Sequence, residues 1–344
     1  MSTAIGRISS LDAATRAKVQ AGCNFVNAEV SRLRKRVITI AICCGGGAGV
    51  LWMLLGGGDP RFPIVVAILV FAYFTNQARK ELASSYKGIV VRRIVQSLGR
   101  GLSYKPVSSL SQQQFEAMDL FNESPHSWKS EDEVSGQKNA VKYALHEVLA
   151  KRRERSNRSR LAWSAGGFMG LALIAAWVGR NRGGVGGDTQ SIIFKGLVVK
   201  LDFNKNFQGH TVVVPDREGQ ILGGLLGESR TRRKKEMVML ENPDFEKLFS
   251  VYSTNDQEAR YIITPKLMEL VMEAQALLGG QLRLCFSKNS LYVAVPQNED
   301  RFEAALFGSA ITPETALGDL VAVVNLAERL VETLDLETRI WTKV

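Results

Sequence analysis

The residues whose types and spacing suit chemistry gather between positions 241 and 261. They are acids accompanied by one arginine and one tyrosine: Glu241, Asp244, Glu246, Asp256, Glu258, Arg260 and Tyr261. Carboxylates that converge beside an arginine can bind a ligand or exchange protons with a substrate. The same residue types also form ion-pair networks that hold a segment against a sheet. If residues 258–263 are extended, Glu258 and Arg260 share a face and can pair. We favour this structural role over a ligand site, and a ligand site over acid–base catalysis.

Signatures of other chemistries are missing from the sequence. Residues 219–227 lack the Gly-Lys-Ser/Thr ending of a phosphate-binding loop, and no Gly-x-Ser-x-Gly nucleophile motif occurs. The three histidines, which have no metal-ligand spacing, are His126, His146 and His210. The cysteines show neither zinc-finger spacing nor a disulfide framework: Cys23, Cys43, Cys44 and Cys285. We therefore predict no catalytic residue, no cofactor and no metal ligand, and a reducing compartment.

The net charge of +10 indicates an anionic partner. The excess lies in three basic clusters, at residues 32–36, 151–160 and 230–235, and the first two adjoin apolar runs. Basic residues beside apolar segments are typical of the cytoplasmic membrane face, where they meet anionic lipid headgroups. No nucleic-acid motif accompanies the clusters, so the expected partner is the lipid bilayer and its anionic headgroups, and no nucleic acid.

Two apolar runs near the N-terminus predict a membrane hairpin. Residues 9–36 have the pattern of an amphipathic helix, which leads into an uncharged run at 37–57 and, after a short connection, a second run at 62–76. Basic residues flank the pair on both outer sides, so the positive-inside rule places both ends in the cytoplasm. Gly45 and Gly49 offer a small-residue face for packing on the partner helix. No cleavable signal peptide is expected, because the N-terminus is polar.

A third apolar run, at residues 161–179, leaves the topology open. Basic residues flank it on both sides, so its orientation is unspecified. If it spans the membrane, the C-terminal domain is periplasmic. If residues 141–146 instead belong to the same sheet as 192–203, both must lie on one side, and the run lies in the interface or re-enters. We favour the one-sided arrangement.

The remaining segments predict an α+β domain. Helices are expected at 81–98, at 111–121 with a Ser111-x-x-Gln114 capping box, at 265–278 with Thr264 as N-cap, and at 313–334. Residues 122–138 are expected to be a loop, and a short helix beginning at Pro243 is expected to include Phe249. The predicted strands are 141–146, 192–203, 210–214, 236–240, 282–286 and 291–295, with a hairpin turn at 288–290. Tyr252 and Tyr261 are expected in the core. Few crossover helices separate the strands, which favours an antiparallel sheet with helices on one face.

These patterns divide the chain into five segments. Residues 1–36 are an amphipathic cytoplasmic helix, 37–80 a transmembrane hairpin, 81–150 the helical and first-strand part of a cytoplasmic domain, 151–191 a basic, apolar and glycine-rich insertion, and 192–344 an α+β domain. The fold class expected is α+β, an N-terminal transmembrane helical hairpin followed by a mainly antiparallel sheet domain with packed helices.

A series of motifs runs through the C-terminal half. They are Phe194-Lys-Gly-Leu, Asp202-Phe203, Thr211-Val-Val-Val-Pro-Asp, the stretch 241–268, Phe286 with Leu291-Tyr-Val-Ala-Val-Pro, and Phe302-Glu303. In this order they resemble a bacterial membrane-associated family known as a domain of unknown function, number three-one-three-seven. The resemblance implies an inner-membrane protein with a cytoplasmic domain, accompanied by LemA-type membrane proteins.

The function expected is that of a membrane-anchored binding or scaffolding protein with a cytoplasmic α+β interaction domain. Its protein partners would be a LemA-type protein or a second copy of the chain. The alternative is a membrane-bound enzyme that uses the acidic and arginine cluster at 241–260. A channel or transporter is disfavoured, because the apolar runs carry no charge that could form a pathway.

Overall fold

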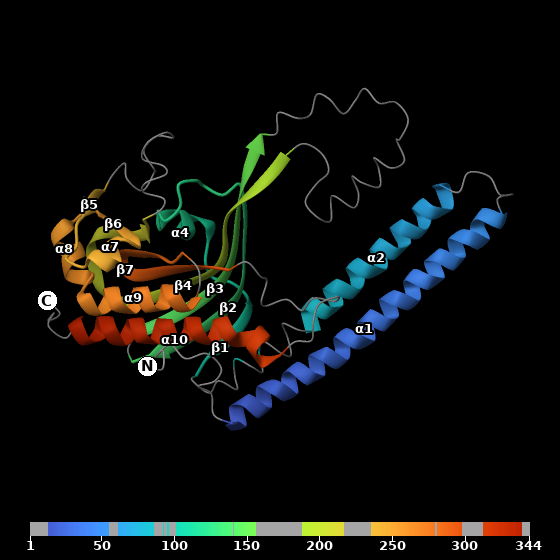
Figure 1. Ribbon diagram of the computed structural model, residues 1–344, viewed down its shortest axis with the longest axis horizontal. Helices are drawn as coiled ribbons and strands as arrows, with labels where there is room; N and C mark the ends of the chain where they lie inside the picture. The colour runs from blue at the N-terminus through green and yellow to red at the C-terminus, as the bar shows by residue number, and fades with distance from the viewer. Residues whose placement is uncertain are drawn as a thin grey trace.

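A pair of helices and an α+β domain make up the chain (Figure 1). The computed structural model describes residues 13–54, 61–85, 92, 95, 101–139, 141–155, 188–216, 235–278, 281–297 and 312–338. The helical pair is α1 (Ala13–Leu54) and α2 (Arg61–Ser85). The domain follows as β1 (Ser103–Val107), α4 (Gln112–Ala117), β2 (Ser127–Lys138), β3 (Val141–Arg155), β4 (Asp188–Pro215), β5 (Glu236–Val238), α7 (Pro243–Glu246), β6 (Phe249–Ser253), α8 (Asp256–Ile262), α9 (Pro265–Leu278), β7 (Arg283–Pro296) and α10 (Pro313–Thr338).

The seven strands form one antiparallel sheet in the order β1-β2-β3-β4-β6-β5, with β7 paired to β4. The long strand β4 is the centre of the sheet: its first half lies between β3 and β7, and its second half pairs with both β7 and β6. The predicted α+β class and the antiparallel arrangement are therefore confirmed.

The predicted hairpin at 288–290 is wrong, because β7 is one continuous strand. Its partners on β4 run from Gly196, opposite Pro296, to Val213, opposite Leu284. The register shifts where β4 carries extra residues, between Asp202 and His210, and Lys288 has a φ of 54° at the same level. A bulge rather than a turn thus explains the polar interruption, and it also joins the two predicted strands 192–203 and 210–214 into one.

Three local predictions fail for related reasons. Strand β2 occupies residues that were expected to be a loop, because its outward side chains are polar while Val134 is fully buried. Strand β6 is buried at all five positions, so its sequence shows no alternation of polar and apolar residues that would predict a strand. The short helix α7 therefore ends before Phe249, which belongs to β6. Residues 256–262 are helical rather than extended, since Asn255 caps α8 by accepting the N–H of Glu258.

Helices were expected on one face of the sheet, but both faces are covered. Helices α9 and α10 lie side by side against one face (Figure 1), where Leu267, Val271 and Leu330 share a core with Leu145 and Leu201. The segment around α4 covers part of the other face. The residues of that second core include Phe115, Met118, Leu120, Val198, Val212 and Cys285.

Helix caps agree with the local sequence. Ser111 and Gln114 form the predicted capping box at the start of α4. The helix α9 has the predicted bounds, and the hydroxyl of Thr264 accepts the N–H of Leu267 at 3.3 Å. These signals act within one turn, which is why they hold regardless of the sheet topology.

Helix α1 is continuous from the domain core into the apolar run. Its first half is amphipathic as predicted, and an apolar stripe of Val19, Val26, Val30 and Leu33 is buried in the same core as the sheet. Its second half exposes apolar side chains, such as Ile42 at 70%. Residues 16–54 form a helix long and apolar enough to cross a membrane, whereas the apolar part of α2, Pro63–Ala78, is shorter. The helical pair extends away from the domain (Figure 1).

The glycine face of α1 is not where α2 packs. Gly45 and Gly49 are exposed, a Cβ atom placed on either would meet nothing within 4 Å, and neither lines the space between α1 and α2, whereas Gly47 does. The prediction that these glycines pack on the partner helix of the hairpin is therefore wrong.

The sheet joins residues on both sides of the 156–187 segment. His146 lies opposite Val198 in the β3–β4 ladder, so the predicted strands 141–146 and 192–203 belong to one sheet. A sheet cannot straddle a bilayer, which puts β1–β3 and β4–β7 on the same side of any membrane. The apolar run at 161–179 lies outside the described residues.

Candidate functional site

Glu258, one of the predicted site residues, binds backbone. Its carboxylate accepts the N–H groups of Gln208 at 3.0 Å and Gly209 at 2.5 Å. A side chain on Gly209 would place its Cβ 2.8 Å from the Cβ of Asn255 and 2.9 Å from the Glu258 carboxylate. Glu258 thus holds α8 against the bulge of β4. Its carboxylate accepts backbone N–H groups that do not bond to a neighbouring strand at the bulge.

Arg260 has a different partner from the one expected. Because α8 is helical, residues two apart point in different directions, and Arg260 pairs with Asp256 one turn earlier at 2.8 Å. Its other nitrogen donates to the carbonyl of Met239 at 2.5 Å, just beyond β5. The predicted shared face of Glu258 and Arg260 is therefore absent.

The other predicted residues are spread over the surface around α7. Glu246 accepts the N–H of Leu240 at 2.7 Å, and Asp244 forms an exposed pair with Lys247 at 2.8 Å. Glu241 is exposed. Tyr261 is 41% exposed, contrary to the expectation of a core position, whereas Tyr252 is buried as expected. Glu241 adds to the effect of Asp256 in raising the pKa of Arg260, but none of these side chains lines either of the two cavities described below.

A polar cavity lies instead on the sheet, on the face opposite α9 and α10. The strand register aligns two rows there: Gln137, Lys142 and Asp202, then Ser135, Ala144 and Lys200. Together with the start of β1 they enclose about 360 Å³, within the usual size of a small-molecule site. The lining is completed by Gly101, Ser103, Ser109, Gly136, Tyr143 and His146. The two lysines and one aspartate give it a positive balance, although Lys200 pairs with Asp202 at 3.1 Å.

His146 is the buried polar residue of this cavity. It is 1% exposed, and its Nδ1 lies 2.9 Å from the hydroxyl of Ser108. That hydroxyl accepts from the N–H of Leu110 and the hydroxyl of Ser130, so it donates its own proton to Nδ1. Burial lowers the pKa of His146 to about 4, against the opposing charge of Glu133. The imidazole is therefore neutral at pH 7 and carries its proton on Nε2.

Glu133 completes the network beneath the cavity. It accepts the N–H of Ser109 at 2.8 Å. Burial alone would raise the pKa of Glu133, but hydrogen bonds from the side chain and the backbone of Ser109, with smaller effects of His146 and Lys105, lower it overall. Glu133 and Ser108 both approach Nδ1 of His146, at 3.8 and 2.9 Å. In a catalytic triad, the hydroxyl and the carboxylate contact opposite nitrogens of the histidine ring. Here both contact Nδ1, so the arrangement suits a rigid support for a binding site and does not activate Ser108 as a nucleophile.

A second buried polar cluster lies under α4. Lys235, whose side chain is 4% exposed, pairs with Asp119 at 2.6 Å. Nearby, the thiol of Cys285 lies 3.6 Å from Nε2 of His210, and burial raises the pKa of that thiol to about 12. The cysteine is therefore a protonated core residue. Among the described residues, no group of three or more His, Cys, Asp or Glu side chains is placed to hold a metal ion.

Sequence reasoning missed the cavity because its residues are far apart in the chain. A period-two pattern of polar residues was present at Glu133, Ser135 and Gln137 on β2. Such alternation signals a strand with one polar face. The polar residues that precede it, at 129–132, obscure the pattern, because polar residues there do not alternate with apolar ones.

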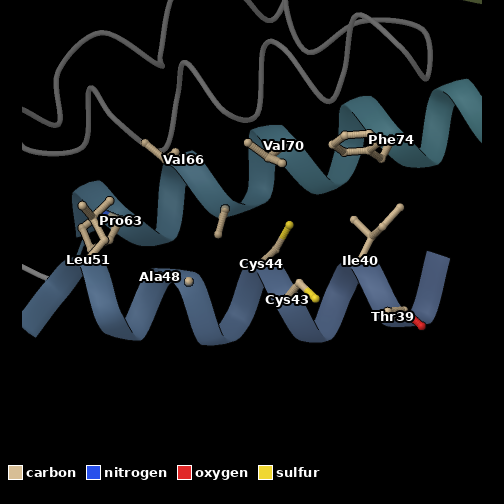
Figure 2. Close-up of a pocket in the computed structure, with 12 residues that line it drawn as sticks. Thr39, Ile40, Cys43, Cys44, Ala48, Leu51, Pro63, Val66, Val70 and Phe74 are labelled. Atoms are coloured by element: carbon tan, nitrogen blue, oxygen red, sulfur yellow. The ribbon is translucent and has the colours of Figure 1, made fainter. Parts of the chain in front are cut away.

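An apolar groove lies between the helices of the hairpin. Figure 2 shows Ile40 and Cys44 pointing from α1 toward α2, with Leu51 and Pro63 at one end of the groove. It encloses about 420 Å³ and is lined by Thr39, Ile40, Cys43, Cys44, Gly47, Ala48, Leu51, Pro63, Val66, Ala67, Val70 and Phe74. Cys43 and Cys44 are thus apolar lining residues of this groove.

The neutral state of His146 predicts a pH dependence of stability. Its folded pKa is depressed below the ordinary 6.5, so between pH 6.5 and about 4 the unfolded chain binds a proton that the folded chain does not. Stability is lost as the pH falls through this window, by up to about 3 kcal/mol. We expect His146→Gln, which can still accept from Ser108, to lose less stability than the parent chain between pH 7 and pH 4.5. Equal losses in chemical denaturation at the two pH values would contradict the assignment.

Comparison with known proteins gives a family for the C-terminal part. No curated protein matches the chain. A solved structure, the crystal structure of the mycobacterial trehalose monomycolate transport factor A, TtfA, aligns over 73% of this chain and 93% of its own, with 12% identity and a TM-score of 0.34. That similarity is too low to carry an argument. Residues 192–336 match the family described as "Protein of unknown function (DUF3137)". This match covers most of the chain from β4 to α10, so that part of the chain is similar to the DUF3137 family.

Proposed function

We propose that the protein is a membrane-anchored binding protein whose α+β domain faces the cytoplasm from a bacterial inner membrane. Its anchor is the α1–α2 hairpin, and its ligand site is the polar cavity on β1–β4. The family match and the long apolar helix fit a membrane-anchored protein.

The observation that carries the proposal is the continuity of α1. One helix of 42 residues buries Val19, Val26 and Leu33 in the domain core and then exposes Ile42 and Val50 in its apolar half. A flexible tether would leave the domain free to tumble. A shared helix instead sets the orientation of the domain, and of its cavity, relative to the bilayer.

The charges at the base of the hairpin support the cytoplasmic orientation. Arg32, Arg34, Lys35 and Arg36 precede the apolar half of α1, and Lys80 and Arg92 follow that of α2. At the other end of the hairpin, the connection carries Asp59, and Arg61 is the first residue of α2. The positive-inside rule therefore places the basic end of the hairpin, where α1 and α2 join the domain, in the cytoplasm. Anionic headgroups are the expected lipid partner of these basic residues.

The cavity supports a binding role. Its polar groups are held by a buried network and include two ammonium groups, hydroxyls and a neutral imidazole donor, which suits a small anionic or polyhydroxyl ligand. Protein partners, a LemA-type protein or a second copy, remain part of the proposal. The enzyme alternative at 241–260 has less support, because those side chains are engaged in separate contacts.

Membrane extraction tests the anchor. We expect the full chain to stay in the membrane pellet in alkaline carbonate and to require detergent for release. Ile42→Asp with Val66→Asp should move it to the supernatant, because both residues are exposed in the apolar half and an ionised group there is costly. A Thr254→Asp control, at an exposed position of the domain, should remain in the pellet. Release of the parent chain without detergent would refute the anchor.

A further inference from the structure

We propose that the groove between α1 and α2 holds one acyl chain of an anionic phospholipid, whose headgroup lies against the basic residues at the base of the hairpin. This inference rests on the proposed membrane insertion and goes beyond it by assigning a lipid-binding site. It concerns the cavity in Figure 2, not the polar cavity of the domain.

The groove exists because small residues lie where the two helices face each other. Cys44, Gly47 and Ala48 on α1 face Ala67 on α2, and a Cβ atom added to Gly47 would meet nothing within 4 Å. The larger Leu51 and Pro63 lie at one end (Figure 2). The helices therefore leave a space of about 420 Å³ that their own side chains do not fill.

The occupant of this space must be apolar. Water needs two to four polar partners in a cavity, and Thr39 is the one lining residue with a hydroxyl; that hydroxyl already donates to the carbonyl of Lys35 at 3.0 Å. Outside the groove the helices expose Ile42, Val50 and Ile64. In a bilayer these faces meet hydrocarbon, so a lipid chain is the apolar molecule that is present at high concentration.

The base of the groove selects the headgroup. Thr39 and Phe74 lie at the end of the groove nearest the basic end of the hairpin. Thr39 is about one turn from the exposed Lys35 and Arg36 on α1, and Phe74 is about two turns from the exposed Lys80 on α2. Arg36 is held only loosely by Glu81, at 3.8 Å, and its side chain is 68% exposed. Arg36, with Lys35 and Lys80 exposed in neighbouring turns, gives this end of the hairpin a positive balance against Glu81, which suits a phosphodiester without a compensating amine.

A matched pair of substitutions separates the groove from the rest of the helix. Gly47→Leu places a side chain in the groove, and Gly49→Leu places the same side chain on another face of α1, where an added Cβ also meets nothing within 4 Å. Both changes give the same gain in helix propensity. The full-length chain is reconstituted in nanodiscs of equal parts phosphatidylglycerol and phosphatidylcholine, and the lipids retained after transfer to detergent are counted by native mass spectrometry.

We expect one retained phosphatidylglycerol for the parent chain and for Gly49→Leu. Occupancy should fall at least roughly ten-fold in Gly47→Leu, because each methylene excluded from an apolar site lowers binding about four-fold. Arg36→Gln with Lys80→Gln should remove the preference for phosphatidylglycerol over phosphatidylcholine, a loss of roughly ten-fold or more.

Each contrary outcome has a distinct meaning. Equal retention in Gly47→Leu and Gly49→Leu overturns the groove as the site, as does a lipid-free dimer in place of a lipid-bound monomer. An unchanged preference in the double variant overturns the headgroup assignment. If carbonate releases the parent chain, the membrane anchor fails and this inference fails with it; if the anchor holds, only the present inference is at stake.

Discussion

Asp119→Asn should destabilise the domain by about 3 kcal/mol, because it leaves the ammonium group of Lys235 buried without its counter-ion. The two side chains lie 2.6 Å apart, and Lys235 is almost completely shielded from water. Asparagine retains the shape of the side chain and tolerates the positive φ of 53° at this position, so the loss reports the charge. The measurement is the free energy of unfolding of the full chain in detergent, from denaturant titration.

A surface aspartate provides the control for this substitution. Asp244→Asn removes the partner of Lys247, an exposed pair whose side chains are 78% and 72% exposed, and it should leave stability nearly unchanged. The loss in Asp119→Asn should also loosen the segment around α4, which Arg283 holds by donating to the carbonyl of Leu120 at 2.9 Å. Equal stabilities of the two variants would show that Lys235 is not buried as described.

Gly196→Ala should cost at least about 3 kcal/mol, at the upper end of ordinary single substitutions. Gly196 lies in β4 opposite Pro296 of β7, with a φ of 156°. A Cβ atom there would lie 2.8 Å from the backbone nitrogen of Gln297 and 2.9 Å from the Cα of Pro296, and closer still to the carbonyl oxygen of Val295. Backbone of a central ladder cannot move aside without breaking its hydrogen bonds.

The matched control for this change is Gly101→Ala. Gly101 also has a positive φ, of 66°, but an added Cβ meets nothing within 4 Å. Only the backbone conformation is penalised there, at about 1 kcal/mol. A Gly196→Ala variant as stable as Gly101→Ala, compared by thermal unfolding in the same detergent, would contradict the close approach of β4 and β7.

Features governed by local rules were predictable from the sequence. The box at Ser111 and Gln114, the cap at Thr264 and the stripe from Val19 to Leu33 depend on residues within one or a few turns. The strand-rich C-terminal half also followed from local composition. These features together suffice for the fold class.

Features governed by tertiary pairing were not predictable. The polar residues around Lys288 suggest a turn, and only the partner strand shows that β7 continues through a bulge. Strand β2 has a polar face because it forms one wall of a cavity, which no window of sequence reveals. The expected pairing of Glu258 with Arg260 was missed in the same way, since the two residues lie on different faces of the helix α8.

The central claim is that the domain and both ends of the hairpin lie on the cytoplasmic side of the membrane. Its most direct test uses single cysteines in a chain whose natural cysteines are replaced, labelled by an impermeant maleimide in cells whose outer membrane has been opened. Asp59→Cys, in the connection between α1 and α2, should be labelled in intact spheroplasts. Asn289→Cys, at an exposed position of β7, should be labelled only after the inner membrane is permeabilised. Labelling of Asn289→Cys in intact spheroplasts would place the domain in the periplasm and contradict the account.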